Sequence, residues 1–423
     1  MAFEVVRDPL WNSIHVDPLA RRIVDTPAFQ RLRYVRQLGL AHLVYPGATH
    51  SRFEHALGAY HLAGVALANL RDRGQLNAVP ESEGSIIRAA ALLHDIGHYP
   101  FSHALEEIGV VHHEDVALPL LESGEVANIL RDKHGDAAPL RIWNLVRGTS
   151  DSALQGLISG SLDLDKIEYL KRDALMCGVP YGEIDVDRLL HSLVVVEDRA
   201  GKKSIGVQEK GLAALESLLF AKYQMYRNVY WHHAVRSATA MYKRMVADAL
   251  RGGAISAESL TSLTDEGLIH LLNSVAPSSI LAALQERRLF KRAMELPASE
   301  LDANEAEWIS EDQDLVLRAE NRLALEFGLG AGDVLLDYPA KTQMLGVDIS
   351  VLTRAGNVER LAPDGLRGVI NLPLLSERLY RSARWLRVFT ARRIAVPSDA
   401  LLRFLHLPRE EVAQLLESGG PLL

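Results

Sequence analysis

"ALLHDIGHYP", residues 91–100, begins as an apolar run and ends in two imidazoles and a carboxylate. The apolar residues have helical spacing, and Gly97 and Pro100 are typical of the end of a helix. Burying a charge without a partner costs several kcal/mol. Something must therefore compensate for His94, Asp95 and His98 at the end of this predicted buried helix, and a metal ion is one candidate.

Composition bounds the class of protein. The chain has 423 residues, 48% hydrophobic and 24% charged, which is the balance of a globular protein with a large core. Its net charge of -8 argues against nucleic acid as a partner. The single cysteine, Cys177, excludes disulfides within the chain and fits a reducing cytoplasm. The N-terminus lacks the apolar run of a signal peptide, and no apolar stretch reaches the ~20 residues that span a bilayer, so we expect a cytoplasmic protein without a membrane partner.

Apolar periodicity predicts a mostly α fold. Helices are expected over residues 51–70, 84–98, 102–109, 112–123, 163–178 and, as one long element, 209–253. The period changes over 191–208, which predicts a β-hairpin turning at 199–201. Further strands are expected within residues 333–340, 346–353 and 385–391. We therefore expect a helical core over residues 1–253 and a small α+β region over 254–423 that packs on the core or forms an oligomer interface.

Histidine is concentrated near the N-terminus, where ten of the 16 histidines lie within residues 1–113. His94 and Asp95 leave a helix about 100° apart, so one ion reaches both only from the side, with ligands from other elements. His55 and Asp165, on two separate predicted helices, are candidates. Two histidines and two carboxylates suit Mn²⁺, Fe²⁺ or Zn²⁺ better than Ca²⁺. Such a metal lowers the pKa of bound water from roughly 15.7 to about 7.

Two interpretations are open for the helix face at residues 163–173 and for Arg52. Asp165, Tyr169 and Asp173 recur every four residues along "DLDKIEYLKRD" (163–173) and share one helix face. That face is either solvated or a platform on which a substrate with a charged end and a sugar would lie. Arg52, one turn before His55, is either an ordinary helix residue or a phosphate clamp beside a metal.

Together these segments resemble the HD-domain deoxynucleoside triphosphate triphosphohydrolases, which include bacterial dNTPases and the catalytic core of the animal sterile-alpha-motif/HD restriction factor. The resemblance covers about residues 5–295 and implies an HD-domain helical bundle. Its motifs are "DTPAFQRLRYVRQLGL" (25–40), "GATHSRFEHALGAYHLAG" (47–64), "LLHDIGHYPFSHALE" (92–106), "HHE" (112–114) and "LDLDKIEYLKRDALMCGVPYG" (162–182).

The resemblance implies a role for each matching residue. The implied metal ligands are His55, His94, Asp95 and Asp165. The residues implied around the scissile phosphate are His98, His103 and His113, with Glu106 beside them where the family often has Asp. The residues implied to hold the phosphates are Arg52 and Lys166, and those implied at the sugar are Gln37, Leu38, Tyr169 and Asp173, with Leu38 crowding a 2′-hydroxyl. A later sugar- and phosphate-contacting segment is implied at Tyr230 and His232. A phosphate-binding arginine of the family has no clean match, and Lys222 lies nearest by spacing, with Arg227 as the alternative.

The implied activity is hydrolysis of a dNTP to a deoxynucleoside and inorganic triphosphate, with metal-activated water attacking the α-phosphorus. The implied metals are Mn, Fe, Zn or Ni at the HD site, and Mg or Mn with the substrate phosphates. The alternatives are an HD-type nucleotidase or phosphodiesterase, and a nucleotide-sensing or partner-binding protein with a vestigial site. Family members form dimers or tetramers and use activator nucleotides. "RRLFKR" (287–292) is a candidate activator site or a solvated edge.

Overall fold

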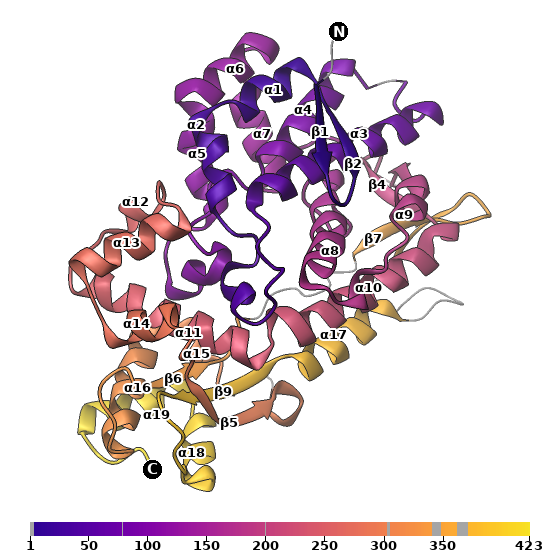
Figure 1. The fold of residues 1–423 in the computed structure, drawn as a ribbon. Helices are drawn as coiled ribbons and strands as arrows, with labels where there is room; N and C mark the ends of the chain where they lie inside the picture. The colour runs from indigo at the N-terminus through magenta and orange to yellow at the C-terminus, as the bar shows by residue number, and fades with distance from the viewer. Residues whose placement is uncertain (1–3, 78, 199, 303–304, 341–347, 362–370) are drawn as a thin grey trace.

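The computed structural model describes residues 4–77, 79–198, 200–302, 305–340, 348–361 and 371–423. Helices dominate, and the strands form three small sheets within these residues, which confirms the mostly α fold. Figure 1 shows the helices of the N-terminal part in the upper body and most C-terminal elements, in orange and yellow, below them. None of the helices in the described ranges is both long and apolar enough to cross a membrane.

The upper body is built around α3, which is buried along most of its length because small residues such as Ala56, Gly58 and Ala63 let its neighbours approach closely. Ser51 and Glu54 form a capping box that starts this helix. The helices of the upper body are α1 (Pro18–Val24), α2 (Pro27–Gln30), α3 (Arg52–Asp72), α4 (Glu81–Leu93), α5 (His113–Glu122), α6 (Gly124–His134), α7 (Ala138–Val146), α8 (Leu164–Cys177) and α9 (Val186–Ser192).

The helix that carries the "ALLHDIGHYP" motif ends earlier than predicted. α4 stops at Leu93, and the chain then turns, with Ile96 N–H donating to Leu93 O and His98 N–H donating to Asp95 O. Gly97 is required in this turn, because a Cβ there would lie 2.1 Å from His113 O at the start of α5. The turn thus brings the His94–His98 segment against α5. The helix predicted over 102–109 is present as a 3₁₀ helix, η3 (Ser102–Ile108).

The single long helix predicted over residues 209–253 is wrong. The segment forms α10 (Leu212–Met225) and α11 (His233–Arg251), separated by one π-helical turn, η7 (Tyr226–Tyr230). The break contains no proline or glycine. Contacts with other parts of the fold are found there instead. The Tyr230 hydroxyl donates to Asp173 on α8, and His232 caps α11 by accepting from Ala234 N–H. π-helical turns are frequent at functional sites.

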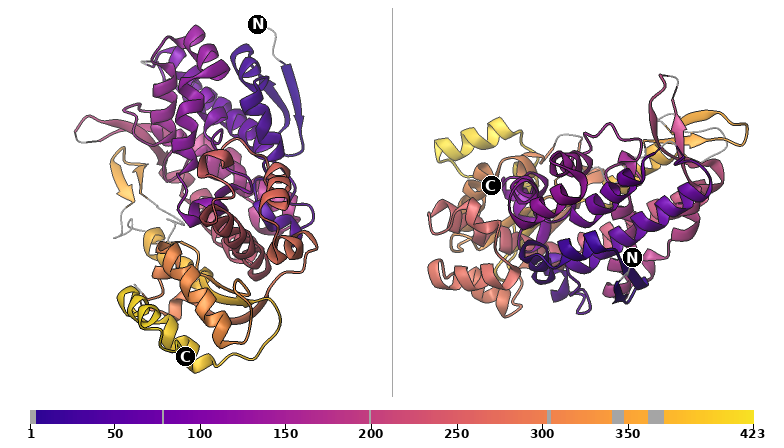
Figure 2. Two further views of the ribbon diagram at one scale, coloured as in Figure 1. Left: turned by 90° about the vertical axis from the view of Figure 1, so that its left-hand side faces the viewer. Right: turned by 90° about the horizontal axis from the view of Figure 1, so that it is seen from above.

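The predicted hairpin is confirmed as antiparallel β3 (Leu193–Glu197) and β4 (Lys203–Gln208), and residue 199 of its turn lies outside the described residues. β4 also pairs in parallel with β7 (Ile349–Leu352), which pairs with β8 (Val358–Leu361). Both views of Figure 2 show the orange β7–β8 pair beside the magenta β3–β4 hairpin. The remaining strands are β1 (Glu4–Asp8) paired with β2 (Asn12–Val16), and β5 (Lys291–Pro297), β9 (Trp385–Thr390) and β6 (Val334–Asp337) in that sheet order.

β6, β7 and β9 lie within the three predicted strand regions, and residues 341–347 fall outside the described ones. The C-terminal helices are α12 (Ala257–Leu260), α13 (Asp265–Val275), α14 (Ser279–Gln285), α15 (Trp308–Glu311), α16 (Gln313–Glu326), α17 (Leu372–Ala383), α18 (Ser398–Leu405) and α19 (Arg409–Ser418). Ile349 and Val351 of β7 join the core of the upper body. A division into domains at residue 253 therefore stays a proposal.

Candidate active site

Three elements bring the four predicted metal ligands together. His55 lies on α3, His94 and Asp95 follow α4, and Asp165 lies in the first turn of α8. His55 Nε2 is 3.1 Å from His94 Nε2, 3.5 Å from Asp95 Oδ2 and 3.0 Å from Asp165 Oδ1. His94 Nε2 is 3.4 Å from Asp95 Oδ2 and 3.5 Å from Asp165 Oδ1. The ligand atoms of His55, His94 and Asp95 therefore lie close to one another, and the Asp165 carboxylate lies beside the two imidazoles.

These separations fit one divalent ion. Ligand atoms bound at about 2.1 Å lie roughly 3.0 Å apart at right angles and roughly 3.4 Å apart in a tetrahedron. The site also gathers negative charge: burial opposes a charge on His55, yet Asp165 and Glu168 outweigh this effect and raise its pKa to about 10. A divalent cation would balance that charge. His55, His94 and Asp95 therefore form a group able to hold a divalent metal through imidazole and carboxylate ligands, and Asp165 as the fourth ligand stays a prediction.

Glu168 is a residue of the candidate site that the sequence analysis did not single out. Its Oε2 is 2.6 Å from His55 Nδ1, so His55 with its proton on Nδ1 presents the Nε2 lone pair to the metal position. Oε1 accepts from Trp11 Nε1 at 2.9 Å and from Arg172 Nε at 2.8 Å. Gly58 makes room for the carboxylate, because a Cβ there would lie 1.9 Å from Glu168 Oε1. The only hint in the sequence is the Glu168–Arg172 spacing, which a surface ion pair shares.

Arg52 contacts the predicted metal ligand Asp95 directly. Its Nη1 donates to Asp95 Oδ2 at 2.6 Å, and its Nε donates to Ser102 Oγ at 3.0 Å. The remaining Nη2 is buried without a partner among the described residues, and the same holds for Gln37 Oε1. Buried polar atoms are normally hydrogen-bonded. These two atoms are therefore available to a ligand.

Four residues predicted around the scissile phosphate form a second cluster. The rings of His98 and His113 stack with centroids 3.7 Å apart, and the His103 ring is 4.6 Å from that of His98. Glu106 bridges the cluster, with Oε2 2.9 Å from His103 Nδ1 and Oε1 2.5 Å from His113 Nδ1. The longer side chain of Glu, compared with Asp, thus reaches two histidines. Asp95 Oδ1 lies 2.9 Å from His98 Nε2 and connects this cluster to the metal ligands.

The histidines of this cluster differ in their environments. Burial, followed by the charges of Arg52 and His113, holds the pKa of His98 well below its usual value, so His98 is neutral. Burial opposes a charge on Glu106, but hydrogen bonds from His103 and His113 outweigh it and hold its pKa far below the ordinary range. The side chain of His103 is 59% exposed. His103 therefore combines contact with solvent and a hydrogen-bonded carboxylate at Nδ1.

A third group lies two turns along α8 from Asp165. Asp173 accepts from the Tyr230 hydroxyl through Oδ2 at 2.7 Å, and its Oδ1 is 2.7 Å from His50 Nε2. Tyr169, one turn along α8 from Asp165, has its ring centre 6.4 Å from that of Tyr230. His50, 2% exposed, is the second residue that the sequence analysis missed. It precedes α3 without helical periodicity, so its contact with Asp173 depends on how α3 and α8 pack.

The two predicted lysines lie near the same end of α8. Lys166 Nζ donates to Gly160 O at 2.9 Å and forms an ion pair with Asp163. Burial opposes its charge, but Asp163 and Asp165 outweigh burial and raise its pKa. Lys222 on α10 is 4% exposed, with Nζ 5.7 Å from the centre of the Tyr226 ring. Burial, and secondarily the charge of Lys166, lower its pKa to about 7.

Leu38 and His232 both lie next to Tyr45. Leu38 packs in the small cluster that contains Tyr45, and the His232 ring is 6.0 Å from the Tyr45 ring. Burial, followed by the charge of His233, lowers the pKa of His232 to about 4, so it is neutral. The predicted roles of these two residues stay proposals.

The helical fold and a His-Asp pair completed by ligands from two other helices define a metal-dependent hydrolase of the HD class. Comparison with known families agrees: residues 52–159 match the HD domain, and residues 184–363 match the HD associated region. The chain belongs to the HD-domain family that includes the deoxynucleoside triphosphate triphosphohydrolases, as the resemblance predicted.

Individual relatives extend this comparison. The chain is 36% identical over 341 residues to an uncharacterised protein of Methanocaldococcus jannaschii, covering 79% of this chain and 69% of that protein. It is 31% identical over 265 residues to the deoxynucleoside triphosphate triphosphohydrolase SAMHD1 homolog of Dictyostelium discoideum, covering 58% of this chain and about half, 48%, of that protein. A phosphohydrolase from Bacteroides thetaiotaomicron has a similar solved structure, with TM-score 0.70 and 25% identity over 92% of this chain and 100% of that one.

Proposed function

We propose that this protein hydrolyses deoxynucleoside triphosphates to a deoxynucleoside and inorganic triphosphate. The observation that carries the proposal is the order of groups along one face of α8. The predicted metal ligand Asp165 lies at one end, Tyr169 one turn further, and Asp173 with its Tyr230 and His50 partners after another turn. Eight residues of helix span about 12 Å. That length suits a substrate with phosphates at one end and a sugar hydroxyl at the other.

Each group has a task in this reaction. A divalent metal (Mn, Fe, Zn or Ni) at His55, His94, Asp95 and Asp165 would supply a water of lowered pKa for attack on the α-phosphorus. Arg52 Nη2, Lys166 and Lys222 neutralise charge on the phosphates, which carry Mg or Mn in solution. Asp173 accepts from a sugar hydroxyl, and Gln37 and Leu38 contact the deoxyribose.

His103 is the proton donor for the leaving 5′-oxygen in this proposal. Its contact with solvent lets it regain a proton, and Glu106 holds its Nδ1 so that Nε2 is free to donate. Neutral His98, buried between Asp95 and His113, instead contacts a phosphate oxygen.

Product analysis tests the proposed function. Purified protein is incubated with Mn²⁺ or Mg²⁺ and each dNTP, singly and mixed, and the products are separated by chromatography. We expect deoxynucleoside and intact triphosphate in equal amounts. Stepwise phosphate release, or turnover only of monophosphates or diesters, would contradict the proposal in favour of an HD-type nucleotidase or phosphodiesterase. Absence of turnover with all metals and nucleotides would favour the sensing or partner-binding alternative.

Lys222 predicts a pH-dependent affinity. Its pKa of about 7 means that the amine loses its charge, and its attraction for phosphate, as the pH rises through neutrality. We expect KM to rise roughly tenfold from about pH 6 to about pH 8, since one charge-assisted hydrogen bond contributes about 1.5 kcal/mol. Lys222→Arg keeps its charge across this range and should flatten the profile. A wild-type KM that is constant over this range would contradict the role of Lys222.

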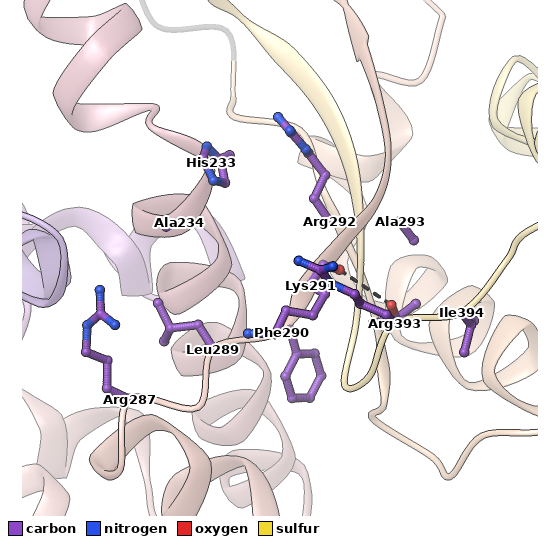
Figure 3. A pocket seen from close by; sticks show the side chains of 11 residues that line it. His233, Ala234, Arg287, Leu289, Phe290, Lys291, Arg292, Ala293, Arg393 and Ile394 are labelled. Atoms are coloured by element: carbon purple, nitrogen blue, oxygen red, sulfur yellow. Dashed lines mark hydrogen bonds between the residues drawn. The ribbon is translucent and has the colours of Figure 1, made fainter.

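A basic cavity outside this site supports an activator nucleotide. The cavity, shown in Figure 3, has a volume of about 480 Å³ and is lined by Arg287, Lys291, Arg292 and Arg393. Arg287 Nε also donates to Leu43 O at 2.6 Å, in the segment that follows Leu38. An anion bound there would therefore act close to the sugar side of the active site. A homo-oligomer, dimer or tetramer, and a cytoplasmic location remain parts of the proposal that rest on the family and the composition.

A further inference from the structure

Residues 263–265, named here the 263–265 turn, lead from α12 into Asp265, the first residue of α13, and are hydrogen-bonded to two loops of the candidate active site. Asp265 is 1% exposed. Its Oδ1 accepts from Phe101 N–H at 2.7 Å, and its Oδ2 accepts from Arg36 N–H at 3.0 Å. Asp265 thereby ties the loop before His103 to the loop that carries Gln37.

Arg31 forms a hydrogen bond with Leu263, at the other end of the same turn. Its guanidinium donates to Leu263 O at 2.9 Å, to Ile96 O at 3.1 Å and to His98 O at 2.8 Å. The last two acceptors flank Gly97, in the turn directly after the metal ligand Asp95. The 263–265 turn is therefore attached at two points to the 96–102 loop, once through Arg31 and once through Asp265.

The loop that receives these bonds has a conformation that L-residues disfavour. Phe101 and Ser102 have φ of 57° and 62°, both in the left-handed region. Two residues in a row in this region need support from outside the loop. Asp265 supplies it at Phe101 N–H, and Tyr242 of α11 supplies it by donating to Pro100 O at 3.0 Å.

Ser102 connects this loop to Arg52, the residue proposed to bind phosphate. Its Oγ accepts from Arg52 Nε at 3.0 Å and donates to Arg36 O at 2.7 Å. His103 is the next residue in the chain, so a shift of Phe101 and Ser102 moves both Arg52 and His103. Asp265 is thus connected to Arg52 through two hydrogen bonds and the Phe101–Ser102 peptide link, and to His103 through one hydrogen bond and two successive peptide links.

We propose that the 263–265 turn is a clamp that positions Arg52, His98 and His103, and that Asp265 and Arg31 are its positioning residues. The clamp belongs to the segment that matches the HD associated region, whereas the loop belongs to the HD domain. The proposal assigns the associated region a direct part in the chemistry. It rests on the proposed function for the identity of the reaction, but the clamp itself is measurable without substrate.

Asp265→Asn is the main test. The amide keeps the size of the side chain, but an NH₂ group replaces one acceptor and faces a backbone N–H. A displacement of about 1 Å in reacting groups costs up to ~10²-fold in rate. We expect kcat to fall about 10–100-fold with a shifted pH–rate profile, while the bound metal per chain stays unchanged. Arg31→Lys, which keeps the charge but loses the planar fork, gives the same result if Asp265→Asn fails to fold.

Glu320→Gln is the matched control. Glu320 of α16 is a buried carboxylate with the same kinds of partner, accepting from Leu336 N–H at 2.8 Å and from Arg244 Nη1 at 2.9 Å. Those partners lie on β6 and α11, so the substitution should lower Tm and leave kcat and the pH profile within twofold of wild type. If Glu320→Gln lowers kcat as much as Asp265→Asn, the effect is general loosening and the clamp is wrong.

Histidine NMR makes the test independent of the reaction. In zinc-loaded protein with ¹³C-labelled histidine, the imidazole signals of His103 and His98, assigned by substitution, should move in Asp265→Asn while that of His406 stays in place. Unchanged signals and unchanged kcat in both clamp variants would overturn the proposal. If the wild-type protein turns over no dNTP, the proposed function fails, and the imidazole signals alone decide the clamp.

Discussion

Asp95→Ala is expected to lower kcat by at least ~10³-fold, which corresponds to about 4 kcal/mol of transition-state stabilisation. The Asp95 carboxylate has several neighbours in the candidate site. Its Oδ2 lies 2.6 Å from Arg52 Nη1 and 3.4 Å from His94 Nε2, and its Oδ1 lies 2.9 Å from His98 Nε2. Removing it takes away a metal ligand and leaves a buried guanidinium without its counter-charge. Steady-state turnover and metal content per chain, measured on the same preparation, check this.

Asp95→Asn serves as the control for shape. The amide fills the same volume but has neither the charge nor the second carboxylate oxygen, so both variants should lose metal and activity together. A variant of either kind with wild-type turnover would exclude Asp95 as a ligand of the reactive metal. Circular dichroism on both variants separates loss of the site from loss of the fold.

Glu168→Gln is expected to weaken metal binding 10–100-fold, the usual effect of removing a group that orients a ligand. Glu168 accepts from His55 through Oε2 and from both Trp11 and Arg172 through Oε1. Glu168, His55 and Arg172 are buried, and Trp11 is half-buried. In Gln an NH₂ group replaces one of the two carboxylate oxygens, so one of these donors would face another donor. Breaking a buried ion pair from one side costs about 3–5 kcal/mol, so the midpoint of denaturant unfolding should also fall clearly. Competition with a metal indicator and equilibrium unfolding measure the two effects.

Glu183→Gln is the control for Glu168→Gln, because Glu183 is exposed just beyond the end of α8. It should change neither metal affinity nor stability, since surface substitutions usually stay within about 0.5 kcal/mol. Wild-type metal affinity in Glu168→Gln would show that His55 is oriented by packing alone.

The local features of the fold could be predicted from the sequence. The buried helix that precedes His94, the helix predicted over residues 51–70 and the hairpin over 191–208 depend on periodicity within one segment, and each is present. The break at Tyr226–Tyr230 could not be predicted, because its sequence contains no helix breaker. The hydrogen bond found at this break, from Tyr230 to Asp173, joins residues that are 57 positions apart in the chain.

The same division holds for the candidate site. His55, His94, Asp95 and Asp165 could be singled out because their residue types are costly to bury without a metal, and the motifs around them are specific. Glu168 and His50 could not, because a carboxylate near an arginine on a helix and a lone histidine before a helix are common on surfaces. The contact of Glu168 depends on Gly58, which leaves room for the Glu168 carboxylate against α3. The contact of His50 depends on the packing of α8 beside the segment that precedes α3.

The sequence by itself thus determined the helical class, the HD family and the set of groups able to hold a metal, since these depend on residue type and short-range spacing. Tertiary structure decided how those groups act together. Packing of α3 on α8 orients His55 through Glu168 and Asp173 through His50, and the 263–265 turn reaches the 96–102 loop from more than 160 positions away in the chain. Hydrogen bonds between such distant segments leave no periodic trace in either one, so only the folded chain reveals them.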